Sequence, residues 1–244
     1  MLSARLIRIL NIVFFGLMVY VNYLAIVYEL GGNSMPELSD RYGNLFTPAN
    51  QTFAIWSLIY LLLAGFLVMQ FFKNAQTRIT QNYLFILSCV FNFSWILVWQ
   101  YEYIILSVLV MLALLFILAK MNLQIREDGN EFYRIVFGIY LGWICIATIA
   151  NVTALIVSYG NLPSIDAQMP ITIGIIIIGL VLVDYIMLKL NNPYLAVSAA
   201  WAFYGVSLKR EADFPQIALA AKLAMAGVIL VAIWIFYQRR VAKK

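Results

Sequence analysis

Long apolar runs separated by short polar stretches dominate the pattern of this chain. Charges, Gly and Pro bound eight such runs, each close to the ~20 residues that a helix needs to cross a bilayer. We predict spans at roughly residues 6–28, 52–72, 82–99, 103–124, 132–158, 170–190, 194–208 and 215–238. The seventh is short, and a re-entrant or interfacial helix is an alternative there. The pattern therefore predicts an all-α, multi-pass membrane protein.

The composition agrees with this class and excludes several others. Hydrophobic residues make up 64% of the 244 positions and charged residues 11%, against about 25% charged residues in soluble domains. Most of the 16 Lys and Arg residues lie on one side if the N-terminus is cytoplasmic, so we predict that both termini are cytoplasmic. The expected location is a bacterial plasma membrane. The +5 charge follows from this bias, and no basic stripe predicts a nucleic-acid partner.

The chain has no His, so the usual general base, the commonest metal ligand and the usual haem ligand are missing. No Walker loop, dinucleotide fingerprint or nucleophile elbow appears in the sequence. We therefore predict no metal, no catalytic residues and no certain cofactor.

The connection formed by residues 29–51 is the longest and is rich in Gly, Pro, Asn and Ser. Long loops of this kind are often lids, and a plain surface linker is the alternative. Near its end, Pro48 and Asn50 lie in TPANQT, which can cap the second span. We name these two as lid residues.

Three predicted spans carry aromatic and polar side chains on one helical face. They are Trp56 and Tyr60 in the second span, Asn92, Trp95 and Trp99 in the third, and Trp143, Ala147 and Asn151 in the fifth. One such stripe alone favours helix–helix hydrogen bonding, worth roughly 0.6–2 kcal/mol for each amide. Three stripes together favour a pocket lined by aromatic rings. Beside the last stripe, GIYLG places Gly138 and Gly142 four apart, a small-xxx-small pattern for close helix packing.

Few ionisable residues lie at depth within the predicted spans; Asp184 does so in the sixth span and Lys222 in the eighth. One interpretation makes them a counter-ion pair or a proton-coupling site. The alternative is that each side chain extends toward its nearer interface, since their depths differ by roughly 10 Å at the helical rise per residue.

Taken in order, FTPANQTFAIWSLIY, FNFSWILVW and IYLGWICIATIAN resemble the TspO/MBR family, the tryptophan-rich sensory proteins related to the mitochondrial translocator protein. The resemblance rests on the ordered set of three stripes and covers roughly residues 1–158. It implies a five-helix bundle with a pocket under the loop between the first two spans. In that family the pocket takes porphyrins, haem, sterols or synthetic hydrophobic ligands, and homodimers are usual.

Two departures from the family pattern stand out. Where the family has Pro-Pro-x-Trp, this chain has Thr47 to Asn50, so one proline and the indole at the pocket mouth are missing. That absence argues against the porphyrin photodegradation described for some members. Residues 159–244 add about three spans, as in a longer, divergent branch of the family. We predict a core at 1–158 and a C-terminal extension at 159–244.

The sequence thus predicts a membrane protein that binds a flat hydrophobic ligand, such as a tetrapyrrole, haem or a sterol-like lipid, as a sensor or carrier. The alternative is a proton-coupled secondary transporter of a small solute. A structural membrane subunit with a filled core, and an enzyme acting on a bound tetrapyrrole, are further interpretations. The expected partners are the lipid bilayer, the hydrophobic small molecule and a second copy of the chain.

Overall fold

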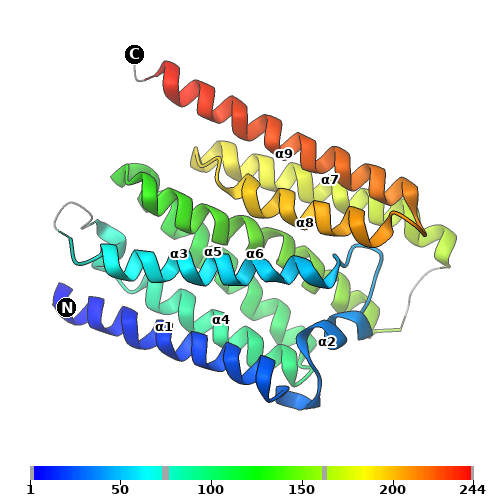
Figure 1. The fold of residues 1–244 in the computed structure, drawn as a ribbon, viewed down its shortest axis with the longest axis horizontal. Coiled ribbons are helices and arrows are strands. Elements are labelled where there is room, and N and C mark those ends of the chain that lie inside the picture. Colours follow the sequence, from blue (N-terminus) through cyan, green and yellow to red (C-terminus); the bar gives the residue numbers. More distant parts are fainter. Residues whose placement is uncertain (1–2, 73–76, 161–163, 243–244) are drawn as a thin grey trace. The chain divides into compact units, whose positions relative to one another are not determined.

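The computed structural model describes residues 3–72, 77–160 and 164–242, and every regular element within them is helical (Figure 1). The α-helices are α1 Ala4–Val27, α2 Met35–Arg41, α3 Ile55–Met69, α4 Leu84–Gln100, α5 Ile104–Asp128, α6 Glu131–Ser158, α7 Ile165–Leu190, α8 Leu195–Arg210 and α9 Pro215–Val241. Short 3-10 helices are η1 Leu30–Gly32, η2 Asn50–Ala54 and η4 Arg78–Thr80. The predicted all-α membrane fold is confirmed.

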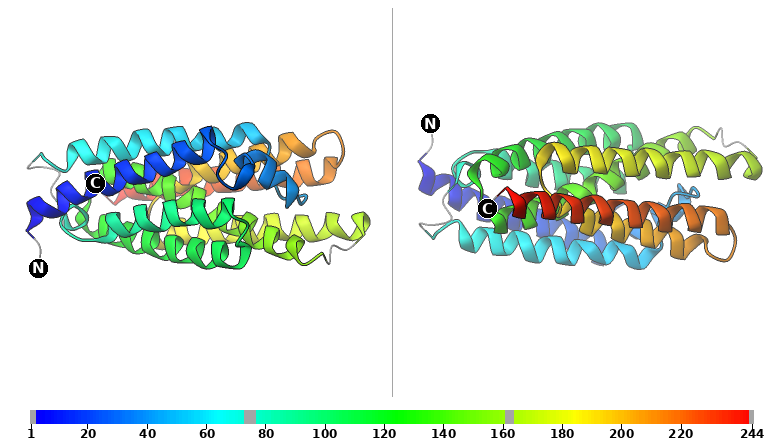
Figure 2. Two further views of the ribbon diagram at one scale, coloured as in Figure 1. Left: turned by 90° about the horizontal axis from the view of Figure 1, so that it is seen from below. Right: turned by 90° about the horizontal axis from the view of Figure 1, so that it is seen from above.

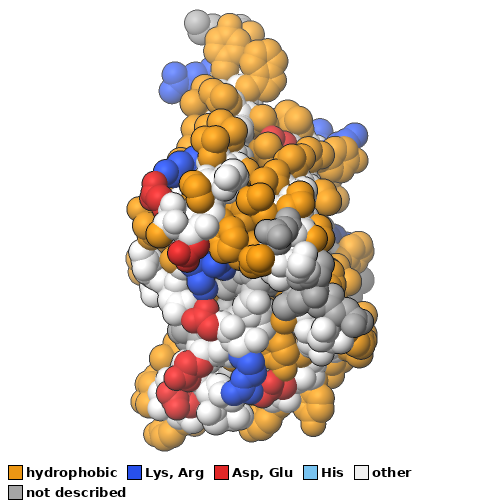
Figure 3. Space-filling view, turned by 90° about the vertical axis from the view of Figure 1, so that its right-hand side faces the viewer, with side chains coloured by type: hydrophobic (Ala, Val, Ile, Leu, Met, Phe, Trp, Pro, Cys, Tyr) orange, Lys and Arg blue, Asp and Glu red, His pale blue; other side chains and the backbone are white. Residues whose placement is uncertain are grey.

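Among the described helices, six are long and apolar enough to cross a bilayer: Ala4–Val27, Asn50–Met69, Ile104–Asp128, Glu131–Ser158, Ala167–Leu190 and Pro215–Val241. The 17-residue α4 and the 16-residue α8 are shorter, and α8 reaches about 24 Å at the helical rise against a hydrocarbon core of about 30 Å. On the face shown in Figure 3, charged side chains lie among hydrophobic ones.

The chain divides into two compact units. Unit 1 comprises Met1–Arg41 and Trp56–Phe137, and unit 2 comprises Tyr42–Ile55 and Gly138–Lys244. The division therefore falls within the loop at 29–51 and within α6. Each unit is described separately below.

In unit 1, α4 packs against both α1 and α5. Its core contains a cluster of aromatic rings around Phe66 of α3. The centroid of that ring lies 4.8 Å from the ring of Phe85, and 5.1 Å from those of Tyr133 and Phe137. All four side chains are completely buried, so α3, α4 and the first turns of α6 share one aromatic core.

In unit 2, α9 packs against α8 and α7, and the three helices run side by side (Figures 1 and 2). The first turns of α8 meet the GIYLG motif of α6. A Cβ at Gly142 would overlap the carbonyl oxygen of Leu195 and the hydroxyl of Ser198. The Ser198 hydroxyl donates a hydrogen bond of 2.6 Å to the carbonyl of Ile139. Gly142 therefore allows a backbone-to-backbone approach of α8 to α6, as the motif predicts for some partner helix, whereas Gly138 makes room for the side chain of Asn192 just before α8.

Gly142→Ala should lower the stability of the protein. The added methyl group meets a backbone carbonyl, which cannot rotate away as a side chain would, and overpacking of this kind costs about 1–3 kcal/mol. The matched control is Gly174→Ala in α7, where a Cβ would have no neighbouring atom within 4 Å. Because Ala favours a helix over Gly, the control should be neutral or slightly stabilising. Thermal unfolding in detergent compares the two variants, and equal midpoints would contradict this contact.

Candidate functional site

The stripe on α3 forms a stacked pair of rings in unit 1. Trp56 and Tyr60 lie with centroids 5.5 Å apart and ring planes 26° apart. Both side chains are half-buried. The i, i+4 spacing in the sequence therefore produces one continuous aromatic surface along this helix.

The stripe on α4 forms a second stacked pair, also in unit 1. The indoles of Trp95 and Trp99 have centroids 6.0 Å apart at 20°, and both are buried. One turn away, the completely buried Asn92 accepts a hydrogen bond of 3.4 Å from Nδ2 of Asn22 on α1. The same amide of Asn22 donates to the carbonyl of Met18 at 2.9 Å. The α4 stripe thus includes a polar contact with α1 that the sequence analysis missed, although Asn22 stands out in its apolar run.

The stripe on α6 belongs to unit 2. Trp143 is 3% exposed, and its indole meets the ring of Phe53 edge to face, with centroids 6.1 Å apart at 83°. Two turns further along α6, Asn151 is likewise buried, and Ala147 lies half-buried between the two. Phe53 was not predicted as a site residue. Its place in FAIW, in the first turn of the predicted second span and three residues before Trp56, is the signal that could have identified it.

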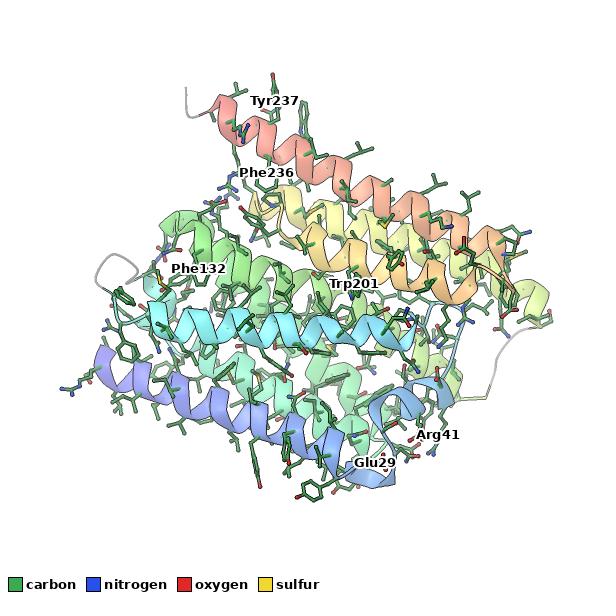
Figure 4. The ribbon with its side chains drawn as sticks, viewed as in Figure 1. Glu29, Arg41, Phe132, Trp201, Phe236 and Tyr237 are labelled. Carbon is green, nitrogen blue, oxygen red and sulfur yellow. The ribbon has the colours of Figure 1, made fainter. Side chains whose placement is uncertain are left out.

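The first half of the loop at 29–51 is structured in unit 1. Ser34 and Glu37 form a capping box at the start of α2, because the Ser34 amide donates to the Glu37 carboxylate at 2.9 Å and the Glu37 amide donates to the Ser34 hydroxyl at 3.4 Å. The hydrogen bond from the Ser34 amide holds the pKa of Glu37 below its usual range. Arg41 then donates at 2.6 Å to both Glu102 and Asn33. This half of the loop is therefore tied to the α4–α5 turn (Figure 4).

The second half of the loop belongs to unit 2 and includes both predicted lid residues. Pro48 is buried and Asn50 is exposed. Between α1 and α3 the loop contains η1, α2 and η2, so much of it has regular structure. Whether it acts as a lid stays a prediction.

The two intramembrane ionisable residues have different surroundings in unit 2. The ammonium of Lys222 forms an ion pair of 2.6 Å with Glu211 in the turn between α8 and α9, and both side chains are exposed. Asp184 lies on α7, where its Oδ1 is buried without a hydrogen-bond partner among the described residues. The partner of Lys222 was not foreseen, and a coupling role for either residue stays a prediction.

The bond between Asn22 and Asn92 gives a test of whether the α4 amide acts in helix association. Asn22→Leu and Asn92→Leu should each destabilise the protein, and the double variant should lose less than the sum of the two. The expected coupling is about 0.6 kcal/mol, typical of interhelical hydrogen bonds in membranes. Thermal unfolding of the four proteins in detergent measures it. Strictly additive losses would show that this bond contributes nothing to the packing of α1 on α4.

A comparison with protein families gives one match: the family described as TSPO-like protein matches residues 8–235. This match runs from α1 into α9 and extends well beyond residues 1–158, on which the resemblance rested. The division of the chain at residue 158 stays a prediction. Searches of curated proteins and of solved structures give no match.

Proposed function

Because the chain belongs to the TSPO-like protein family, we propose that it binds a flat hydrophobic molecule, such as a tetrapyrrole, haem or a sterol-like lipid, as a sensor or carrier. Its family and its apolar helices make it an integral membrane protein. The single observation that carries the proposal is the pairing of aromatic rings at membrane depth, with buried carboxamides on the same helical faces of α4 and α6.

The chemistry of these surfaces suits such a ligand. Paired rings offer broad apolar faces on which a planar molecule can stack, and a few fixed polar groups orient a ligand in an otherwise apolar site. We assign the stacking role to Trp56, Trp95, Trp99 and Trp143, and hydrogen bonding to Tyr60, Asn92 and Asn151. Ala147 leaves room beside the rings. Pro48 and Asn50 belong to the loop that would cover the site, and a homodimer is part of the same proposal.

Metal-free porphyrin is the most direct probe. The chain contains no His, so any side-chain ligand to haem iron would come from residues such as Tyr or Met. Protoporphyrin IX carries no iron, so it tests binding to the flat apolar surface without any contribution from a bond between a side chain and iron.

Protoporphyrin IX should quench the tryptophan fluorescence of the purified protein with a saturable dependence on concentration. Trp95→Phe in unit 1 and Trp143→Phe in unit 2 should each weaken binding by up to roughly 12-fold, because the phenyl ring keeps only part of the stacking surface of the indole and a whole aromatic contact is worth about 0.5–1.5 kcal/mol beyond its buried area. Ala147→Leu should weaken binding by filling the space that Ala147 leaves. Affinity is read by titration in nanodiscs, with empty nanodiscs to subtract partitioning into lipid.

The matched control is Trp234→Phe. This indole lies on α9, is 54% exposed and pairs with Tyr237 outside the three stripes. It should leave affinity unchanged. Absence of saturable quenching in the parent protein, or equal affinities in all of these variants, would refute the proposed ligand class. A loss confined to variants of one unit would place the ligand on that unit.

A second candidate, a proton-coupled transporter of a small solute, is favoured by one observation. The Asp184 carboxylate has a buried oxygen without a hydrogen-bond partner among the described residues. Carboxylates at membrane depth often mark proton or ion pathways.

Asp184→Asn tests this candidate because it removes the exchangeable charge and keeps the shape of the side chain. In proteoliposomes with an internal pH-sensitive dye, a panel of small organic solutes should include one that drives proton entry. That proton entry should disappear in Asp184→Asn. Asp213→Asn, in the exposed turn before α9, is the control and should retain it. Solute-driven proton entry that persists in Asp184→Asn would exclude the carboxylate from coupling.

A further inference from the structure

Residues 44–53, which we call the docked segment, begin with a compact turn. The side-chain oxygen of Asn44 accepts a hydrogen bond of 2.9 Å from the amide of Phe46, and its carbonyl accepts one of 3.1 Å from Thr47. The Thr47 hydroxyl accepts the amide of Asn44 at 3.3 Å. Leu45, Phe46 and Thr47 are buried. The turn is therefore a defined structure with consecutive carbonyl groups available to a donor.

The donor is Arg210, the last residue of α8. Its Nη2 donates to the carbonyl of Asn44 at 2.7 Å, and its Nε donates to the carbonyl of Leu45 at 3.0 Å. A guanidinium group is suited to this arrangement, because its planar donors reach two acceptors at once and its charge strengthens each bond. The contact joins positions more than 160 residues apart in the chain.

Two further contacts hold the other end of the docked segment on the same helix. The indole Nε1 of Trp201 donates to the carbonyl of Thr52 at 2.8 Å, and the amide of Ala49 donates to the carbonyl of Gly205 at 3.0 Å. A Cβ at Gly205 would overlap the hydroxyl of Thr52, so only glycine permits this approach. Trp201 and Gly205 are four residues apart and share one face of α8, and Figure 4 labels the former.

The docked segment also contacts α6. The side-chain Nδ2 of Asn44 donates to the hydroxyl of Thr153 at 3.0 Å, and Phe53 lies against Trp143. The segment thus forms a bridge between α8 and the aromatic stripe of α6. In this arrangement the ring of Phe53 meets the indole of Trp143 edge to face.

We infer that α8 holds the docked segment in place through these hydrogen bonds, an arrangement that we call the mount. Trp201, Gly205 and Arg210 are then positioning residues for the ligand surface on α6. The positioning role rests on the proposed function, because it concerns the bound ligand. The mount does not depend on any ligand. By holding the docked segment in place, Arg210 slows the release of a molecule stacked on Trp143.

Hydrogen–deuterium exchange of the ligand-free protein tests the mount. Arg210→Met keeps the apolar stem and removes the donors, so peptides covering residues 44–53 should exchange about tenfold faster or more, as expected for loss of hydrogen bonds from a charged group. The exchange rate of these peptides in Arg210→Lys should lie between the rates in the parent protein and in Arg210→Met, because an ammonium group cannot reproduce the planar donor geometry of a guanidinium group. Lys209→Met removes a neighbouring charge and should leave these peptides unchanged.

Gly205→Ala is a second variant, which adds a methyl group and leaves Arg210 intact. Gly205→Ala should raise the hydrogen-exchange rate of the same peptides, whereas Gly174→Ala should leave it unchanged. Unchanged exchange in both Arg210→Met and Gly205→Ala would overturn the mount, whatever ligand the protein binds. A uniform rise over all of α6–α9 in both variants would also overturn it, since that result reports general unfolding.

Release of protoporphyrin IX tests the positioning role. In stopped-flow fluorescence, the dissociation rate should rise in Arg210→Met by about the factor seen in exchange of residues 44–53 and should stay at the parent value in Lys209→Met. A faster-exchanging segment with unchanged release would overturn the positioning role. If the parent protein shows no saturable binding, the proposed ligand class and the positioning role both fail, while the exchange experiment still decides the mount.

Discussion

The close approach of α8 to α6 at Gly142 is the contact on which much of unit 2 depends. Backbone carbonyl and glycine lie where a larger residue would separate the helices, and the Ser198 hydroxyl bonds the α6 backbone at the same place. Inside a bilayer, lipid tails are as apolar as any side chain, so packing and hydrogen bonds hold helices together. With α8 fixed in this way, its later turns present Gly205 and Arg210 to the docked segment.

Unit 1 is held together differently. Its centre is the cluster of aromatic rings around Phe66, and some of its buried amides form pairs between segments. Asn11 of α1 donates to Gln70 at 3.0 Å, and Gln70 donates to the carbonyl of Arg8 at 3.3 Å. A polar group without partners is expensive in hydrocarbon, which explains why such amides occur in pairs. The Asn22–Asn92 contact belongs to the same class, so Asn92 contributes to packing whether or not it also meets a ligand.

Hydropathy predicted the helices well because the requirement for ~20 apolar residues is local to each span. Contacts between residues far apart in the chain could not be predicted in this way. The GIYLG motif indicated close packing, yet nothing in the sequence indicated that α8 would be the partner. For Lys222, spacing allowed an interfacial position, but its ion pair with Glu211 depends on the fold of the turn after α8. The Ser-x-x-Glu pattern of Ser34 and Glu37 is enough to predict a capping box. The prediction was not made, because this loop was described only by its composition.

The candidate site shows the same limit. Helical periodicity identified the three stripes, since i, i+3 and i+4 positions share a face by geometry. It did not identify Phe53, whose contact with Trp143 depends on the docked segment. The family pattern has an indole where this chain has the exposed Asn50. One turn of η2 later, Phe53 supplies a ring against Trp143. Under the proposed function, Phe53 takes the place of that indole beside the ligand surface on α6, and α8 holds the segment to which Phe53 belongs.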